Sequence, residues 1–201
     1  MPTDPVDPEA VTEWASGSPT LESQVRWKRI GRRAVDRLAL GLGRLLPTPL
    51  LVRYLRNPAS ALTVGLLRGS GALIGEGTRI KGRLYLDNAS DLSRLVLGRN
   101  CYIGDGCTFD LANRVTIGDQ VVLSAEVMIV THQDDGERSL VQLPRRDADT
   151  TIGSGCWLGV RATTLVGVTM GPGSMLAAGG LLLQDTEPGT RYGGVPAKRL
   201  A

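Results

Sequence analysis

An aliphatic residue recurs every six positions through most of this chain, and few folds accept such a period. The spacing fits neither an α-helix, with about 3.6 residues per turn, nor a long two-residue alternation. It predicts short strands joined by corners, because Gly and Asp tolerate the backbone conformations that corners need. The recurring residues are Ile74, Ile80, Leu86, Leu97, Ile103, Phe109, Ile117, Leu123, Ile129, Ile152, Leu158, Thr164, Met170, Leu176 and Leu182.

The remaining positions of each six-residue unit follow a rule as well. The residue after the aliphatic one is mostly small or acidic, and another small residue lies four positions after it. Cys101, Cys107 and Cys156 all fall on this second small position, so we expect them to fill the core rather than to bind metal or form disulfides. Parallel stacking of such units buries a continuous aliphatic column. A single Phe and 26 Gly in 201 residues fit a repetitive, mainly β core that does not depend on aromatic side chains.

The six-residue period is interrupted in several places, and one interruption is long enough to predict a loop. The period breaks after Leu86 and resumes at Leu97, and after Phe109 it continues two residues late at Ile117. Residues 133–151 are polar and contain no repeat, which predicts an extruded loop. Loops on a rigid scaffold commonly cover its site.

The segment before the repeats has a different character. Residues 1–20 are acidic and predict a disordered tail, whereas residues 21–56 carry nine basic residues against two acidic ones. Apolar residues at helical spacing predict a basic amphipathic helix that ends near Gly41, Gly43 and Pro47 and is followed by a short helix over 50–56. The predicted domains are therefore a tail over 1–20, a basic helical arm over 21–70 and the repeat domain over 71–201.

Two interpretations of the arm stay open. It packs against the repeat domain or against another copy of the chain, or it makes peripheral contact with an anionic membrane through residues 21–56. Nucleic-acid binding is not expected, because no base-stacking platform or recognised motif accompanies the charge. The acidic start is unlike a signal peptide, no apolar run is long enough to span a bilayer, and the cysteines suit a reducing compartment. These features predict a cytoplasmic protein, with a membrane-facing location as the alternative.

The six-residue pattern resembles that of the hexapeptide-repeat acyltransferases, a superfamily that includes maltose, galactoside and exopolysaccharide O-acetyltransferases. The resemblance covers about residues 58–201. It includes L-L-R-G-S-G-A-L-I-G at 66–75 and Y-G-G-V-P-A-K-R-L at 192–200. It implies a left-handed parallel β-helix with an N-terminal helical arm and an extruded loop, and a homotrimer with active sites between neighbouring subunits.

His132 is the only histidine in the chain, and it stands where the repeat gives way to the loop. The motif V-T-H-Q-D-D around it resembles the one that carries the catalytic base of this superfamily. Imidazole is present as a free base near neutral pH, so it can take the proton of an attacking hydroxyl and return it to a departing thiolate. Backbone amides of a coil are the expected donors to the oxyanion.

The other groups of the site are less determined. Asp110, Glu126 and Asp134 are the acidic residues expected on the substrate side, and any of them, or a backbone carbonyl, could orient the imidazole ring. A single histidine excludes the three-histidine zinc site of the carbonic anhydrases that share this type of β-helix, so no metal is expected. No serine lies in a nucleophile-elbow motif, which favours direct transfer without an acyl-enzyme.

The later repeats resemble the coenzyme A groove of the superfamily. The resemblance assigns main-chain contacts with acetyl-CoA to Val160 and Ala178, and contacts with the nucleotide phosphates to Lys198 and Arg199. Trp157 either lines this groove or packs on the outer face. Leu183-Gln184-Asp185 stands where the superfamily often has Thr-Lys-Asp, so phosphate recognition differs here or depends on Lys198, Arg199 and Arg191.

The leading interpretation is an acetyl-CoA-dependent O-acetyltransferase that acts on a sugar or polysaccharide hydroxyl. The first alternative is an acyltransferase that modifies an antibiotic or another secondary metabolite. The second is a non-catalytic trimeric β-helix scaffold, against which the retained His132 argues.

Overall fold

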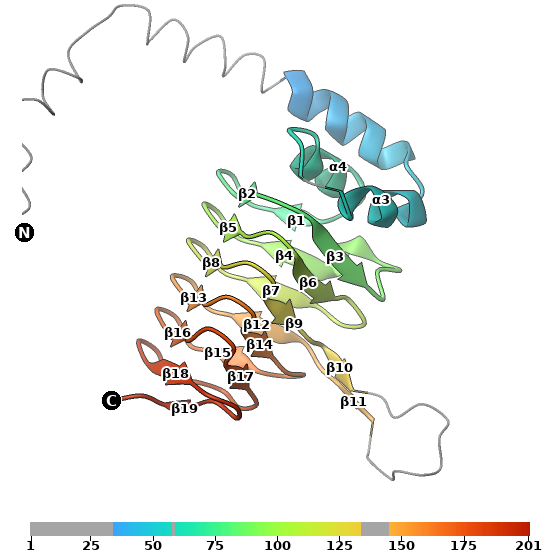
Figure 1. The fold of residues 1–201 in the computed structure, drawn as a ribbon. Coiled ribbons are helices and arrows are strands. Elements are labelled where there is room, and N and C mark those ends of the chain that lie inside the picture. Colours follow the sequence, from blue (N-terminus) through green and yellow to red (C-terminus); the bar gives the residue numbers. More distant parts are fainter. Residues whose placement is uncertain (1–33, 58, 134–144) are drawn as a thin grey trace, which may run out of the picture.

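The structure is a computed structural model, and it describes residues 34–57, 59–133 and 145–201. These residues form a parallel β-solenoid of about five turns with helices at its N-terminal end, which confirms the mainly β repeat fold (Figure 1). The predicted tail over 1–20, residues 21–33 of the predicted arm, and Asp134 lie outside the described residues.

Three parallel sheets form the sides of the solenoid. Sheet A contains β1 (Leu73–Ile74), β4 (Leu95–Leu97), β7 (Val115–Ile117), β12 (Thr150–Ile152) and β15 (Thr169–Met170). Sheet B contains β2 (Arg79–Ile80), β5 (Tyr102–Ile103), β8 (Val122–Leu123), β13 (Trp157–Leu158) and β16 (Met175–Leu176), and it ends in the hairpin of β18 (Arg191–Gly193) and β19 (Lys198–Arg199). Sheet C contains β3 (Leu84–Asp87), β6 (Cys107–Asp110), β9 (Met128–Ile129), β14 (Thr163–Thr164) and β17 (Leu181–Leu182).

The strand register confirms the six-residue period. Each coil contributes one strand to each sheet, so every third recurring residue stacks on the one a coil earlier. The three columns are Ile74–Leu97–Ile117–Ile152–Met170 in sheet A, Ile80–Ile103–Leu123–Leu158–Leu176 in sheet B, and Leu86–Phe109–Ile129–Thr164–Leu182 in sheet C.

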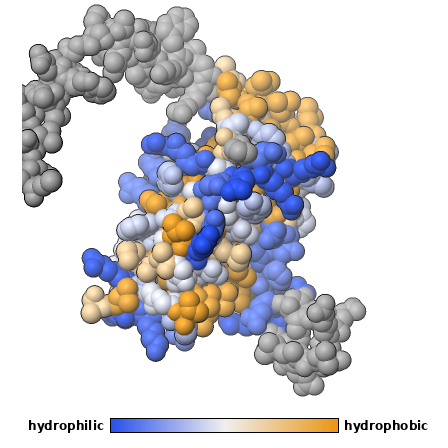
Figure 2. All heavy atoms as spheres, viewed as in Figure 1, coloured by the Kyte–Doolittle hydropathy of each residue, from blue (hydrophilic) through white to orange (hydrophobic). Residues whose placement is uncertain are grey.

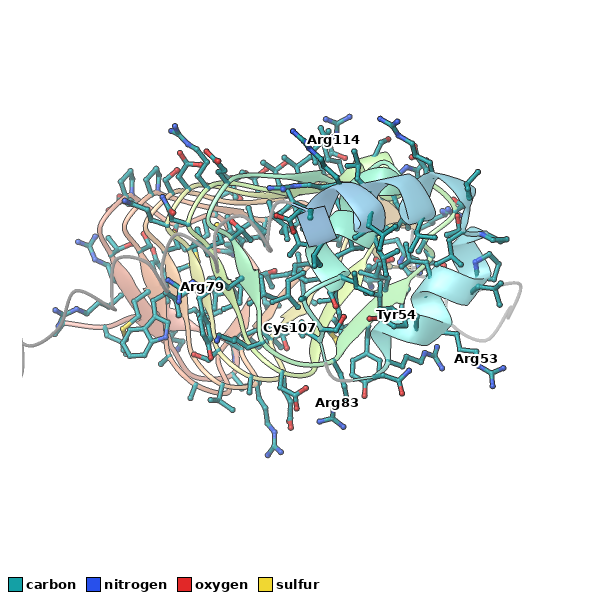
Figure 3. The ribbon with its side chains drawn as sticks, turned by 90° about the horizontal axis from the view of Figure 1, so that it is seen from above. Arg53, Tyr54, Arg79, Arg83, Cys107 and Arg114 are labelled. Carbon is teal, nitrogen blue, oxygen red and sulfur yellow. The ribbon has the colours of Figure 1, made fainter. Side chains whose placement is uncertain are left out.

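The cysteines occupy the core, as predicted. Cys101, Cys107 and Cys156 are buried and free, and Figure 3 shows Cys107 inside the solenoid. Burial raises the pKa of the Cys107 thiol to about 11 and raises that of Cys156 as well. A thiol held in this way is protonated at neutral pH and is a poor nucleophile.

One buried group lacks a partner. Among the described residues, Thr164 Oγ1 is the buried side-chain oxygen that makes no hydrogen bond, although Thr164 stands in an aliphatic column. We expect Thr164→Val to stabilise the fold by about 1 kcal/mol, because it removes an unsatisfied hydroxyl at nearly constant volume.

The matched control is Thr150→Val. Thr150 is equally buried, but its Oγ1 donates to the carbonyl of Val130 at 2.7 Å, so the same substitution there should cost about 1 kcal/mol. Denaturant unfolding of both variants at one protein concentration measures the difference. Equal effects of the two substitutions would contradict this account.

The helical arm differs in detail from the prediction. A helix occupies residues 34–45 and runs through Gly41 and Gly43, α3 occupies Thr48–Leu55, and α4 (Thr63–Gly69) was not foreseen. Gly43 is needed inside its helix, because an added Cβ would lie 2.3 Å from the carbonyl oxygen of Leu66 in α4. In the described part of the chain, no helix is long and apolar enough to cross a bilayer.

Candidate active site

All the interruptions of the repeat fall at one corner of the solenoid. The chain leaves its six-residue period after β3, β6 and β9, which are successive strands of sheet C, and each irregular connection leads to sheet A. We call this edge the C–A corner; in coils 1 to 3 its described residues are 88–94, 111–114, 130–133 and 145–149. Because the coils stack, three irregular segments that are distant in sequence lie next to one another there.

His132 emerges from this corner. It belongs to β10 (His132–Gln133), which pairs antiparallel with β11 (Arg146–Asp147) and projects from the solenoid (Figure 1). Of the predicted loop 133–151, Thr150 and Thr151 belong to β12 of the solenoid, and residues 134–144 lie outside the described residues.

Asp110, at the end of β6, is the group that holds the His132 ring. The ring Nδ1 lies 2.6 Å from Asp110 Oδ2, and the backbone N–H of His132 donates to the same oxygen at 3.0 Å. The His132 side chain is 32% exposed and that of Asp110 only 7%, so the carboxylate is buried behind a ring that solvent can reach.

Asp110 is itself fixed by further donors. Its Oδ2 accepts from the backbone N–H of Thr131 at 2.8 Å. Its Oδ1 accepts from Asn88 Nδ2 at 2.8 Å and from the N–H of Ala112 at 3.2 Å. Burial by itself would raise the pKa of Asp110, but the hydrogen bonds from His132, Asn88, Thr131 and Ala112 outweigh it and hold this pKa well below its usual range.

This network sets the tautomer of the ring. An ionised carboxylate only accepts, so Nδ1 must carry the hydrogen that points at Asp110. In the neutral ring Nε2 then keeps its lone pair. The arrangement is an oriented base on the surface, with a buried negative charge placed to stabilise the imidazolium that forms when the base takes a proton.

The structure answers which acidic residue contacts the ring. Glu126 does not: it lies at the corner between sheets B and C, where its Oε2 pairs with Arg161 Nε at 2.5 Å. Asp134 lies outside the described residues, and no carbonyl is needed for Nδ1 because Asp110 occupies it.

Sequence reasoning missed two neighbours of this pair. Asn88 follows the first interruption of the repeat, and Asp147 stands opposite His132 in the β10–β11 pair. Asp147 also pairs with Arg145, and Asn113 Nδ2 lies 3.4 Å from its Oδ1. Asn88 stands at the point where the repeat first breaks, and that position could have marked it as a site residue. Nothing in the spacing of the sequence linked Asp147 to His132.

The residues assigned to acetyl-CoA lie at another edge. Val160 and Ala178 occupy equivalent places in consecutive coils at the B–C corner, because Trp157 pairs with Met175 and Leu158 with Leu176. Val160 is exposed, and its carbonyl accepts from Gly179 N–H at 2.8 Å. Gly159 is needed for this stacking, because an added Cβ would lie 2.5 Å from the amide nitrogen of Ala178 in the next coil.

The remaining assigned residues lie on sheet B or its terminal hairpin. Trp157 stands half-exposed on the outer face of β13, and its Nε1 donates to Ser124 Oγ at 3.1 Å. Lys198 and Arg199 are both exposed on β19, but neighbouring residues of a strand point to opposite sides. Arg199 Nη1 pairs with Glu187 Oε2 at 2.9 Å, which leaves Lys198 and Arg191 as the described cations there without an ion pair.

A single chain does not bring these two groups together. His132 follows a strand of sheet C, at the C–A corner, whereas Val160 and Ala178 precede strands of sheet C, at the B–C corner. Figure 3 shows the separation: Arg83 of the B–C corner and Arg114 of the C–A corner project from opposite sides of the solenoid. Within residues 34–57, 59–133 and 145–201, no three His, Cys, Asp or Glu side chains are grouped so that they could hold a metal ion.

Comparison with known sequences identifies the repeats. The family model "Hexapeptide repeat of succinyl-transferase" matches residues 94–130 and 149–183. The chain is 31% identical over 118 residues to a chloramphenicol acetyltransferase of Escherichia coli, which covers 59% of this chain and 56% of that protein. It is 27% identical over 139 residues to the galactoside O-acetyltransferase of Escherichia coli K12, covering 66% and 64%. The chain thus spans less than two thirds of the length of these relatives.

The fold also matches solved structures. A galactoside acetyltransferase in complex with coenzyme A superposes with a TM-score of 0.67 at 24% sequence identity, over 81% of each chain. This likeness confirms the predicted left-handed parallel β-helix.

Proposed function

We infer that this chain, which has the hexapeptide repeats and the β-helix of the hexapeptide-repeat acetyltransferases, transfers an acetyl group from acetyl-CoA to a hydroxyl. The observation that carries the proposal is the His132–Asp110 pair, an exposed imidazole held at 2.6 Å by a buried carboxylate. Within the described residues this network fixes one ring nitrogen of His132 and the other makes no hydrogen bond, an arrangement that suits a base and that a scaffold does not require.

The proposed reaction needs one base. Nε2 of His132 takes the proton of the acceptor hydroxyl while the hydroxyl oxygen bonds to the thioester carbonyl carbon. The C–S bond then breaks, and the proton passes from His132 to the leaving thiolate, so the base returns to its first state. Asp110 stays ionised throughout and stabilises the imidazolium between these steps.

The donor fits the B–C corner of coils 4 and 5. There, Val160 and Ala178 are exposed at equivalent places in consecutive coils, and the half-exposed Trp157 lies in the same coil as Val160. On the terminal hairpin of sheet B, Lys198 and Arg191 are the described cations that form no ion pair, so they are available to contact phosphate. The galactoside acetyltransferase that shares the fold was solved with coenzyme A.

We propose that the complete site forms between two copies of the chain in a trimer, with His132 from one copy and the B–C corner from its neighbour. The support is that these groups lie at opposite edges of sheet C in one chain. Closed rings with heterologous interfaces join two such different edges.

This assembly predicts complementation between inactive variants. His132→Ala and Ala178→Trp should each be inactive alone, the second because its side chain fills the groove. Unfolding and refolding the two variants together should restore roughly a quarter of wild-type activity, because random trimers place an intact His132 beside an intact groove at that frequency. Activity that stays at the level of the separate variants would show that each copy holds its own site.

Two acceptor classes have support. A sugar or polysaccharide hydroxyl fits the galactoside O-acetyltransferase relative. A drug-like or secondary-metabolite hydroxyl fits the chloramphenicol acetyltransferase relative, which has the higher identity. Both need the same proton transfer at His132, so the chemistry does not separate them.

The test of the proposed function is a coupled assay for CoA release. Acetyl-CoA should raise the melting temperature of the protein, as a ligand selective for the native state must. Panels of sugars and of hydroxylated antibiotics should then show which class releases CoA above the hydrolysis background. Absence of any thermal shift with CoA or acetyl-CoA, together with a shift from another thioester, would contradict the choice of donor.

A further inference from the structure

Helix 34–45 leaves a row of leucines on the surface. Leu38, Leu42 and Leu45 are 61%, 45% and 82% exposed, and their spacing of four and three residues places them on one face of the helix. Leu50 in the first turn of α3 is exposed as well. Figure 2 shows the result as a hydrophobic patch over this helix, at the upper right of the molecule.

A different face holds the helix to the protein. Ala39 is fully buried, and an added Cβ on Gly65 of α4 would lie 2.4 Å from its methyl group. A Cβ added to Gly43 would lie 2.3 Å from the carbonyl oxygen of Leu66, and one added to Gly69 would lie 2.3 Å from the carbonyl oxygen of Leu40. Small residues therefore make the contact between helix 34–45 and α4, so the exposed leucines contribute nothing to the core of the chain.

Arginines border the leucine row. Arg37 and Arg44 are seven residues apart and flank the row along one side, and Arg53 and Arg56 lie in and just after α3. All four are exposed, and none forms an ion pair within the described residues. The sequence before the helix continues this composition, with five basic residues against one acidic residue over 21–33.

We propose that the N-terminal end of the β-helix docks on an anionic lipid surface. The leucine row inserts into the interfacial region of the bilayer, and the arginines meet the lipid phosphates; an exposed apolar stripe beside a basic border is the composition that binds such surfaces. A two-fold contact with a second copy through this face is disfavoured, because it would set the Arg37 and Arg44 rows against each other.

Docking leaves the candidate site free. The helices cap the first coil, whereas His132 follows the third coil and the B–C groove belongs to coils 4 and 5 (Figure 1). The membrane proposal does not depend on the proposed acetyl transfer, and lipid binding is measured without any acceptor.

The experiment is co-sedimentation of the full chain with vesicles of phosphatidylcholine alone and of phosphatidylcholine mixed equally with phosphatidylglycerol. The wild type should bind the mixed vesicles, and it should bind them less at high salt. The triple variant Leu38→Ser/Leu42→Ser/Leu45→Ser should bind at least about tenfold more weakly. The control is Leu183→Ser at the opposite end of the chain, which is 43% exposed and should bind like the wild type.

A second variant separates charge from insertion. Arg37→Gln/Arg44→Gln should weaken low-salt binding by roughly 25-fold, or about fivefold for each arginine near an anionic surface. The proposal is overturned if the triple variant binds the mixed vesicles as well as the wild type does. It is also overturned if the wild type does not prefer the mixed vesicles. If the triple variant loses an oligomer that light scattering detects in the wild type, and vesicle binding is unchanged, the leucines face another copy instead.

Discussion

Replacing His132 with Asn is expected to lower the rate of acetyl transfer by about 10²–10⁴-fold, the usual contribution of a general base. Asn keeps part of the size of the ring and a donor that can face Asp110, so the substitution removes basicity with little loss of packing. The affinity for acetyl-CoA should hardly change, because the base acts in the transition state and the predicted groove lies at another corner. Steady-state rates of CoA release, together with binding by calorimetry, measure both quantities.

Thermal melts must accompany the rates, so that an unfolded variant is not read as an inactive one. A folded His132→Asn protein with near wild-type turnover would reduce His132 to a structural role.

Replacing Asp110 with Asn is expected to cost about 10²–10³-fold in turnover, since the carboxylate fixes the tautomer and stabilises the imidazolium. An Asn side chain can present its NH₂ group to Nδ1, which would favour the opposite tautomer and leave Nε2 protonated.

Asp119→Asn is the matched control. Asp119 is also a corner carboxylate that accepts a backbone hydrogen bond, from Arg99 N–H at 2.7 Å, but it lies between sheets A and B and contacts no histidine. Its substitution should leave turnover nearly unchanged. If both variants lose activity alike, the effect of Asp110 is one of general stability.

The depressed pKa of Asp110 also predicts a pH dependence of stability. The group favours the folded state once pH exceeds the ordinary carboxyl pKa of about 4, and this contribution is lost as pH falls toward the lower folded-state value. In Asp110→Asn that part of the acid destabilisation should be missing. Comparison of melting temperatures of the two proteins between neutral pH and about pH 3 tests the sign.

The repeat and its columns were predictable because they are local in origin. A residue six positions along the chain occupies the same place on the next side of the solenoid, so one short rule repeated along the sequence determines which side chains face inward. For the same reason the three cysteines could be assigned to the core from their position in the unit. His132 stood out in the sequence because it lies where that rule stops and because the motif around it resembles that of a known superfamily; its role as the base stays a prediction.

The partner of His132 was not predictable, because irregular connections follow no period. Asp110, Glu126 and Asp134 were equal candidates in the sequence. The stacking of the coils places Asp110 at the end of β6, at the C–A corner beside His132. It places Glu126 at the B–C corner, where Glu126 pairs with Arg161. Asn88 and Asp147 reach the same corner from segments that no spacing connects.

The helical arm shows the same limit for apolar side chains. Its amphipathic pattern identified a leucine face, but a pattern does not say what that face contacts. Gly43, read from sequence as a helix end, instead lets α4 approach the helix, and that contact turns Leu38, Leu42 and Leu45 outward. The sequence by itself determined the repeat and its core, and it singled out His132 as the candidate base. Only the tertiary structure decided which polar residues meet and which apolar face stays exposed, because both depend on contacts between segments whose separation in the chain follows no rule.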